Sequence, residues 1–177
     1  MIRCYVTDRH RGDPLLHAAT AVGDGIDLIQ VREKDLDARR LFDLVCAIRR
    51  LAVGSKTKVL VNGRLDVAIA ASIDGVHLPG NGLPPRRVRP LVRTLGCSVH
   101  SIDEARSAED DGADFLIFGP IFETPGKTAV GLDALRHVVQ SVRIPVLAIG
   151  GISHQNTPSV LSAGASGIAA IRLFQAN

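Results

Sequence analysis

The sequence predicts a compact α/β fold, a single-domain TIM (β/α)8 barrel whose last helix is incomplete or missing. Short runs rich in Val, Ile and Leu recur along all 177 residues, and segments with helical periodicity separate most of them. Alternating strands and helices indicate parallel pairing, because a parallel crossover needs about a dozen residues or more. Eight such strands fit a closed barrel, although 177 residues are few beside the roughly 250 usual for that fold.

The expected strands are short, apolar and spread over the whole chain. Asp13-Pro14 and Leu83-Pro84 are typical of helix starts, since proline is tolerated in the first helical turn. Only residues 174–177 follow the last expected strand, so an eighth helix is missing or shifted. The expected strands cover residues 2–7, 26–31, 58–62, 75–78, 97–100, 114–118, 145–149 and 167–173.

The chain shows no internal boundary. No linker or low-complexity tract divides it, so we expect one domain over residues 1–177. A doubly wound open sheet is the alternative fold. The segment 7–12 after the first strand contains no GxGxxG, the glycine-rich turn that such a sheet uses for dinucleotides.

Composition excludes several functional classes. The net charge is +3, but only 3% of residues are aromatic and none is Trp, so platforms for base stacking are few and we expect no nucleic-acid partner. No apolar run approaches the roughly 18 residues that span a bilayer, so we expect no membrane partner. The three cysteines Cys4, Cys46 and Cys97 form no disulfide or metal pattern, which indicates a reducing cytoplasm.

Five stretches place polar residues at the carboxyl ends of expected strands, where the active site of such a barrel is built. The first carries Gln30, Arg32 and Lys34 on one strand face, and these donors suit a phosphate or a carboxylate. A strand end that frays into a solvated loop is the alternative. The second carries Asn62, which both donates and accepts hydrogen bonds; an ordinary turn is the alternative.

The third stretch holds Ser98 and His100 on one strand face. Histidine is a general acid and base suited to neutral pH, so His100 is a candidate for proton transfer. The alternative is structural: Ser101 caps a helix that begins at Ile102, with Glu104 in its first turn, and His100 serves only the backbone.

The fourth and fifth stretches point to anions. The fourth stretch, residues 118–128, runs into the long loop 122–131 and contains Thr124 and Lys127; it indicates an anion-binding loop or a lid, with an ordinary connection as the alternative. Gly150-Gly151 follows the seventh strand, and its exposed backbone N–H groups are the strongest phosphate signal in the chain. Arg172, expected within the last strand, adds a positive charge there.

In this order and spacing, the five stretches resemble the thiamine phosphate synthase/TenI superfamily over essentially the whole chain. The combination is specific, although no single piece of it is. The resemblance implies a TIM barrel and a small phosphorylated thiazole ligand, whose phosphate meets Gly150 and Gly151. The matching segments are 5–8, 30–34, 75–78, 98–101, 112–115, 119–127 and 148–152.

The resemblance also implies two branches. The synthase joins a pyrimidine diphosphate to a thiazole phosphate and uses Mg²⁺ held by two aspartates, at the positions of Gly63 and Gly82 here. Glycine supplies no side-chain oxygen for Mg²⁺. In the TenI branch a thiazole tautomerase moves a proton without metal, and the position of its catalytic histidine is Pro120 here.

Our leading hypothesis is therefore a TenI-like protein of thiamine biosynthesis, with metal-free tautomerase activity, no cofactor and no metal site. The alternatives are a Mg²⁺-dependent thiamine phosphate synthase and a non-catalytic regulatory homologue. A homo-oligomer is one of the assembly states left open. The expected proton carriers are His100, Glu123 and Lys127, and the expected ligand contacts are Gln30, Arg32, Lys34, Asn62, Ser98, Thr124, Gly150, Gly151 and Arg172.

Overall fold

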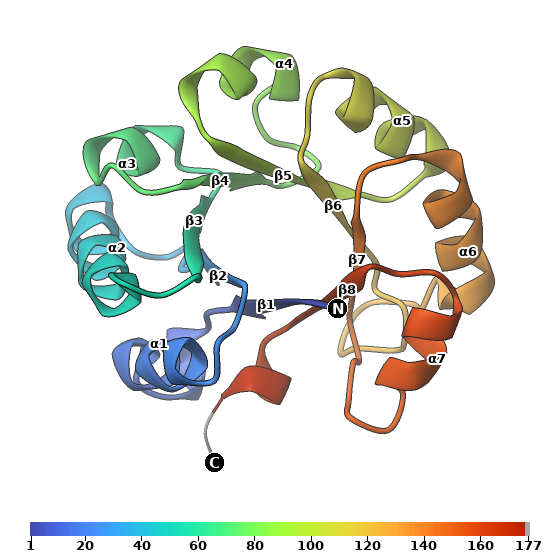
Figure 1. Cartoon of the computed structure of the whole chain (residues 1–177), viewed down its shortest axis with the longest axis horizontal. Coiled ribbons are helices and arrows are strands. Elements are labelled where there is room, and N and C mark those ends of the chain that lie inside the picture. The colour runs from blue at the N-terminus through green and yellow to red at the C-terminus, as the bar shows by residue number, and fades with distance from the viewer. Residues whose placement is uncertain (176–177) are drawn as a thin grey trace.

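A computed structural model describes residues 1–175 and shows a closed barrel of eight parallel strands. The strands pair in chain order, and β8 returns to pair with β1 (Figure 1). The strands are β1 (Ile2–Val6), β2 (Leu28–Val31), β3 (Lys58–Asn62), β4 (Gly75–Leu78), β5 (Thr94–Val99), β6 (Phe115–Phe118), β7 (Val146–Ile149) and β8 (Gly167–Ala170). The predicted barrel is confirmed.

Seven α-helices within the described part of the chain surround the barrel (Figure 1). They are α1 (Pro14–Gly23), α2 (Ala38–Ala52), α3 (Leu65–Ala70), α4 (Pro85–Val88), α5 (Ile102–Asp110), α6 (Gly131–Ser141) and α7 (Thr157–Ser162), with 3-10 turns η1 (Arg9–Arg11), η2 (Arg89–Leu91) and η3 (Arg172–Phe174). In residues 1–175, none of these helices has the length and apolar character required to cross a bilayer.

The strands are buried on both faces, which explains why they are apolar runs and do not alternate with polar residues. Side chains such as Val6, Leu60 and Ile117 fill the inside of the barrel. Their strand neighbours point outward and pack beneath the helices, as Val61 and Leu116 do. The core is thus two concentric layers, and polar side chains are left to the strand ends.

The local signals for helix starts are confirmed. The carboxylate of Asp13 accepts a hydrogen bond from the N–H of Leu15 at 2.8 Å and so caps α1. Ser101 caps α5 in the same way, by accepting the N–H of Glu104 at 3.1 Å. The Glu104 carboxylate completes the cap by accepting the N–H of His100 at 2.7 Å.

Two strand boundaries differ from the prediction by three residues. β5 begins at Thr94, three residues earlier than expected, because Asp114 accepts the N–H of Leu95 at 2.7 Å and extends the ladder. β8 ends at Ala170, where its pairing with Tyr5 of β1 stops. Arg172 therefore lies in η3, outside the last strand.

The ring of helices is incomplete between α7 and α1 (Figure 1). Within residues 1–175 only η3 follows β8, as the sequence predicts. A cavity of about 750 Å³ lies there, with Ala21 of α1, Leu161 of α7 and Phe174 of η3 in its wall.

We predict that Gly75→Ala destabilises the barrel, because a Cβ at Gly75 would lie 1.8 Å from the Thr94 carbonyl oxygen of the neighbouring strand. Strand separation cannot adjust cheaply within a closed ring, so we expect a loss of about 3 kcal/mol or more in the free energy of unfolding by urea. Gly23→Ala is the control: its Cβ would meet nothing within 4 Å, so stability should stay within about 1 kcal/mol of wild type. Equal stability of the two variants would contradict the prediction.

Candidate active site

A cavity of about 650 Å³ opens at the carboxyl ends of the strands. Val6, Asn62 and Ile149 are the last residues of β1, β3 and β7, and all three line it. The wall is completed by loop residues that follow the strands. This is the end of a TIM barrel at which βα loops build active sites.

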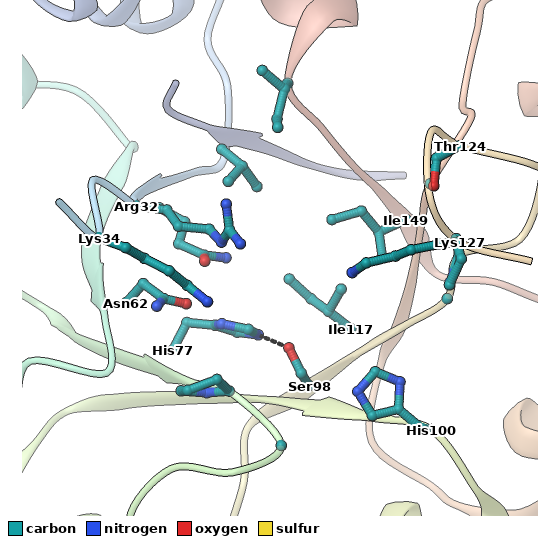
Figure 2. Close-up of a pocket in the computed structure, with 18 of the residues that line it drawn as sticks. Arg32, Lys34, Asn62, His77, Ser98, His100, Ile117, Thr124, Lys127 and Ile149 are labelled. Carbon is teal, nitrogen blue, oxygen red and sulfur yellow. Dashed lines mark hydrogen bonds between the residues drawn. The ribbon is translucent and has the colours of Figure 1, made fainter. Parts of the chain in front are cut away.

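Three cationic side chains enter this cavity, from Arg32, Lys34 and Lys127. In Figure 2 Lys34 and Lys127 reach toward each other from opposite walls, and Arg32 lies beside Lys34. The one acidic residue in the lining is Glu104, whose carboxylate caps α5. The cavity therefore carries excess positive charge and favours an anionic ligand.

The floor of the cavity is apolar. Ile117, Ile149, Val6 and Ile171 contribute to it, from four different parts of the barrel wall. An aliphatic floor beneath a cationic mouth suits a ligand with a flat ring at one end and phosphate at the other.

His77 and Ser98 bring polar atoms to this apolar floor. The His77 side chain is 3% exposed, its Nε2 lies 3.4 Å from the Ser98 hydroxyl, and its Nδ1 has no hydrogen-bond partner in residues 1–175 (Figure 2). Its ring stacks on Phe115 with centroids 6.2 Å apart. Burial, and secondarily the charge of Arg32, lower the pKa of His77 to about 3, so the ring is neutral at physiological pH.

A buried network fixes the end of β2, from which Arg32 and Lys34 project. Glu33 is 4% exposed, and its carboxylate accepts the Thr7 hydroxyl at 2.6 Å and the N–H of Arg9 at 3.1 Å. The Thr7 oxygen in turn accepts the N–H of Arg32 at 3.0 Å. A buried carboxylate is tolerated because donors surround it, and here the donors tie β1 to β2.

The loop after β6 is anchored at both ends. The N–H of Ile121 donates to Ile149 of β7 at 2.8 Å, and the N–H of Val130 donates to Pro120 at 2.8 Å. Between these anchors the N–H of Lys127 donates to the Thr124 carbonyl at 3.0 Å and makes a tight turn. The turn places Thr124 and Lys127 over the cavity (Figure 2).

The structure brings nine of the twelve predicted site residues to this cavity. They are Gln30, Arg32, Lys34, Asn62, Ser98, His100, Thr124, Lys127 and Gly150. Glu123, Gly151 and Arg172 do not belong to its lining within residues 1–175, and the side chain of Arg172 starts beyond the strand end. Sequence reasoning gave no role to His77 or Glu33.

Both missed residues have an explanation in the fold. His77 lies between Val76 and Leu78, so strand alternation turns it to the opposite face, the barrel interior, beside Asn62 of β3. The alternation along β4 could therefore have identified His77 from the sequence. Glu33 alternates away from Arg32 and Lys34, and only the contact with Thr7, 26 residues earlier in the chain, shows why it is buried.

Comparison with known proteins identifies the family. The family model described as "Thiamine monophosphate synthase" matches residues 4–174. This chain belongs to the thiamine monophosphate synthase family. The thiamine-phosphate synthase of Moorella thermoacetica is 42% identical over 158 residues, 85% of this chain and 75% of that protein. That of Chlorobium phaeobacteroides is 39% identical over 175 residues, 95% of this chain and 85% of that protein.

Solved structures agree with this assignment to the thiamine monophosphate synthase family. Thiamine phosphate pyrophosphorylase from Pyrococcus furiosus superposes with a TM-score of 0.89 at 36% identity and covers 96% of this chain and 85% of that one. These relatives correct the leading hypothesis of the sequence analysis. They are named as synthases, so the expectation of a thiazole tautomerase, an isomerase, is wrong, and the synthase alternative is favoured. The tautomerase expectation depended on Gly63 and Gly82, which replace the two implied metal-binding aspartates, whereas the similarity to synthases extends over most of the chain.

We predict that stability falls in acid because of His77. The folded pKa of about 3 lies below the unfolded value of about 6.5, so the unfolded chain binds an extra proton between these values and unfolding becomes easier as the pH falls through this window. At pH 5 the cost relative to pH 8 is about 2 kcal/mol from this group. Urea unfolding of wild type and His77→Gln at both pH values measures the difference. His137→Gln, which retains the buried His77, should keep the full difference; equal pH dependence in all three proteins would contradict the prediction.

We also predict that Thr7→Val destabilises the fold by about 2 kcal/mol or more, because it leaves the Arg32 N–H and the buried Glu33 carboxylate each short of a partner. Thr7→Ser keeps the hydroxyl and should lose about 1 kcal/mol or less. Urea unfolding compares the two, and a loss in Thr7→Ser as large as in Thr7→Val would assign the effect to packing.

Proposed function

We propose that this protein joins a pyrimidine diphosphate to a thiazole phosphate and releases inorganic pyrophosphate. The similarity over most of the chain to proteins named thiamine-phosphate synthase is the observation that carries the proposal. A cavity with an apolar floor and a cationic mouth supports it, because both substrates are flat rings that carry phosphate groups.

The side chains divide the work by their chemistry. Arg32, Lys34 and Lys127 bind phosphate oxygens, for which guanidinium and ammonium groups are the natural partners. Gln30, Asn62 and Ser98 orient the rings by hydrogen bonds over the apolar floor. Thr124 and the backbone at Gly150 complete the phosphate contacts of the thiazole.

The reaction requires charge stabilisation more than proton transfer. A carbon–nitrogen bond forms from the thiazole ring nitrogen to the pyrimidine methylene carbon, the carbon–oxygen bond to the diphosphate breaks, and pyrophosphate leaves with the bonding electrons. Cations already in place around the departing oxygens lower this barrier. The coupling moves no proton, so His100 and Glu123 have no acid–base role in this step.

The residues present do not fit the magnesium ion that the synthase resemblance implies. Mg²⁺ takes hard oxygen ligands, often carboxylates, in octahedral geometry. Within residues 1–175 no three His, Cys, Asp or Glu side chains are grouped to hold a metal ion. We therefore assign no step to a metal.

Incubation of the purified protein with both substrates tests the proposal. We expect a coupled thiamine phosphate product by chromatography, with pyrophosphate released in equal amount. Arg32→Ala should lower kcat/KM by about 100-fold or more, the size of effect expected when a charge that stabilises a leaving group is removed. Lys58→Ala, which removes a cation from the start of β3 at the opposite end of the barrel, should leave turnover unchanged. No product under any metal condition would overturn the proposal.

A further inference from the structure

The backbone where β3 and β4 open into the cavity leaves no simple place for metal-binding side chains. Gly63 has φ +69°, a left-handed conformation that strains other residues, and its N–H donates to the His77 carbonyl at 2.9 Å. Gly82 closes a tight turn by donating its N–H to the Pro79 carbonyl at 2.8 Å, and a Cβ on Gly82 would lie 2.9 Å from that same oxygen. The backbone conformation at Gly63 and Gly82 therefore disfavours residues with a side chain, in addition to the fact that glycine itself carries no carboxylate.

Three carboxylates near the mouth are already engaged. Glu33 is surrounded by the Thr7 and Arg9 donors, and Glu104 holds the N–H of His100. Asp66, at the start of α3, is paired with the Arg64 guanidinium through contacts of 2.6 and 2.9 Å. Using any of these for a metal would break a cap, a buried network or an ion pair.

The cationic side chains of the same cavity, unlike these carboxylates, are not engaged in ion pairs within residues 1–175. Arg32, Lys34 and Lys127 make no ion pair with any carboxylate in residues 1–175, although all three line the cavity. Figure 2 shows Lys34 and Lys127 reaching into the same space above Ser98 and Ile117, with Arg32 beside Lys34. A group with several negative oxygens is attracted by all three charges, whereas a divalent cation placed there would be repelled by them.

From these observations we infer that the site binds a diphosphate directly through Arg32, Lys34 and Lys127, and that no divalent cation held by the protein takes part in that binding. The identification of the anion as a diphosphate rests on the proposed function. The charge balance that a carboxylate-held metal would provide comes here from three fixed cations, so binding should weaken as salt rises.

Isothermal titration with inorganic pyrophosphate tests the inference without any turnover. We expect saturable binding in EDTA, and a Kd that changes by less than about threefold when MgCl₂ replaces EDTA. Lys34→Ala and Lys127→Ala should each weaken binding by about 10-fold, the scale of one charge-assisted contact. Lys58→Ala removes the same charge at the far end of the barrel and should bind as wild type does. No binding in EDTA, or binding at least about 10-fold tighter with Mg²⁺, would overturn the inference.

The two proposals fail in different ways. Metal-free pyrophosphate binding without any coupled product would overturn the proposed function and leave the inference standing. Coupled product that requires Mg²⁺, together with pyrophosphate binding that requires it, would overturn the inference and leave the proposed function standing. Synthesis that continues in EDTA, with the same dependence on Lys34 and Lys127 as binding, supports both.

Discussion

Closure of a parallel sheet into a ring is the constraint on which this site depends. Every strand must end at the same mouth, so residues far apart in sequence become neighbours through strand register alone. Val6 pairs with Gln30, Asn62 pairs with His77, and Ser98 pairs with Ile117. The cavity lining is a direct product of this register, and a shift of one residue in β2, β3, β4 or β5 would turn a polar side chain away from the cavity.

Electrostatics then decides what the mouth can accept. A barrel of apolar strands has a low-dielectric interior, in which charges at the rim act strongly on a bound ligand. The rim of this protein carries cations on the loops that follow β2 and β6, while Glu33 and Glu104 accept backbone N–H groups of loops at the rim. Positive potential and loop rigidity thus come from separate sets of residues, since Glu33 and Thr7 fix the backbone at Arg32, and Glu104 fixes the backbone at His100.

The barrel and much of the site were predictable because local rules determine them. Alternation along β2 placed Gln30 and Arg32 on the cavity side, and most strand ends fell within a few residues of prediction. The exceptions depend on contacts that a single sequence does not display. Arg172 lies outside the last strand because the pairing of β8 with β1 ends at Ala170 and Tyr5. Glu33 would be taken for a solvated charge from the sequence alone, since its burial depends on the contact with Thr7.

The error in function has a related cause. Gly63 and Gly82 are two positions, and reasoning from them alone pointed away from synthesis, while identity near 40% with named synthases extends over most of the chain. The lack of carboxylates at Gly63 and Gly82 changes which groups balance the negative charge of a ligand. It does not by itself identify the reaction. Only comparison with relatives shows whether a change at one motif outweighs the similarity of the whole chain.

The incomplete helical ring has a consequence for how the molecule opens. The β1–β8 seam is the place where the ring closes, and its outer side between α7 and α1 is covered by a single 3-10 turn instead of a full helix. Apolar side chains beneath this turn, such as Ala21 and Ile168, are buried, but less of the chain covers them than elsewhere around the barrel. This makes the seam the least protected part of the sheet. Amide protons of β1 and β8 should accordingly exchange with solvent before those of β3 and β4, so that fraying starts at the β1–β8 seam.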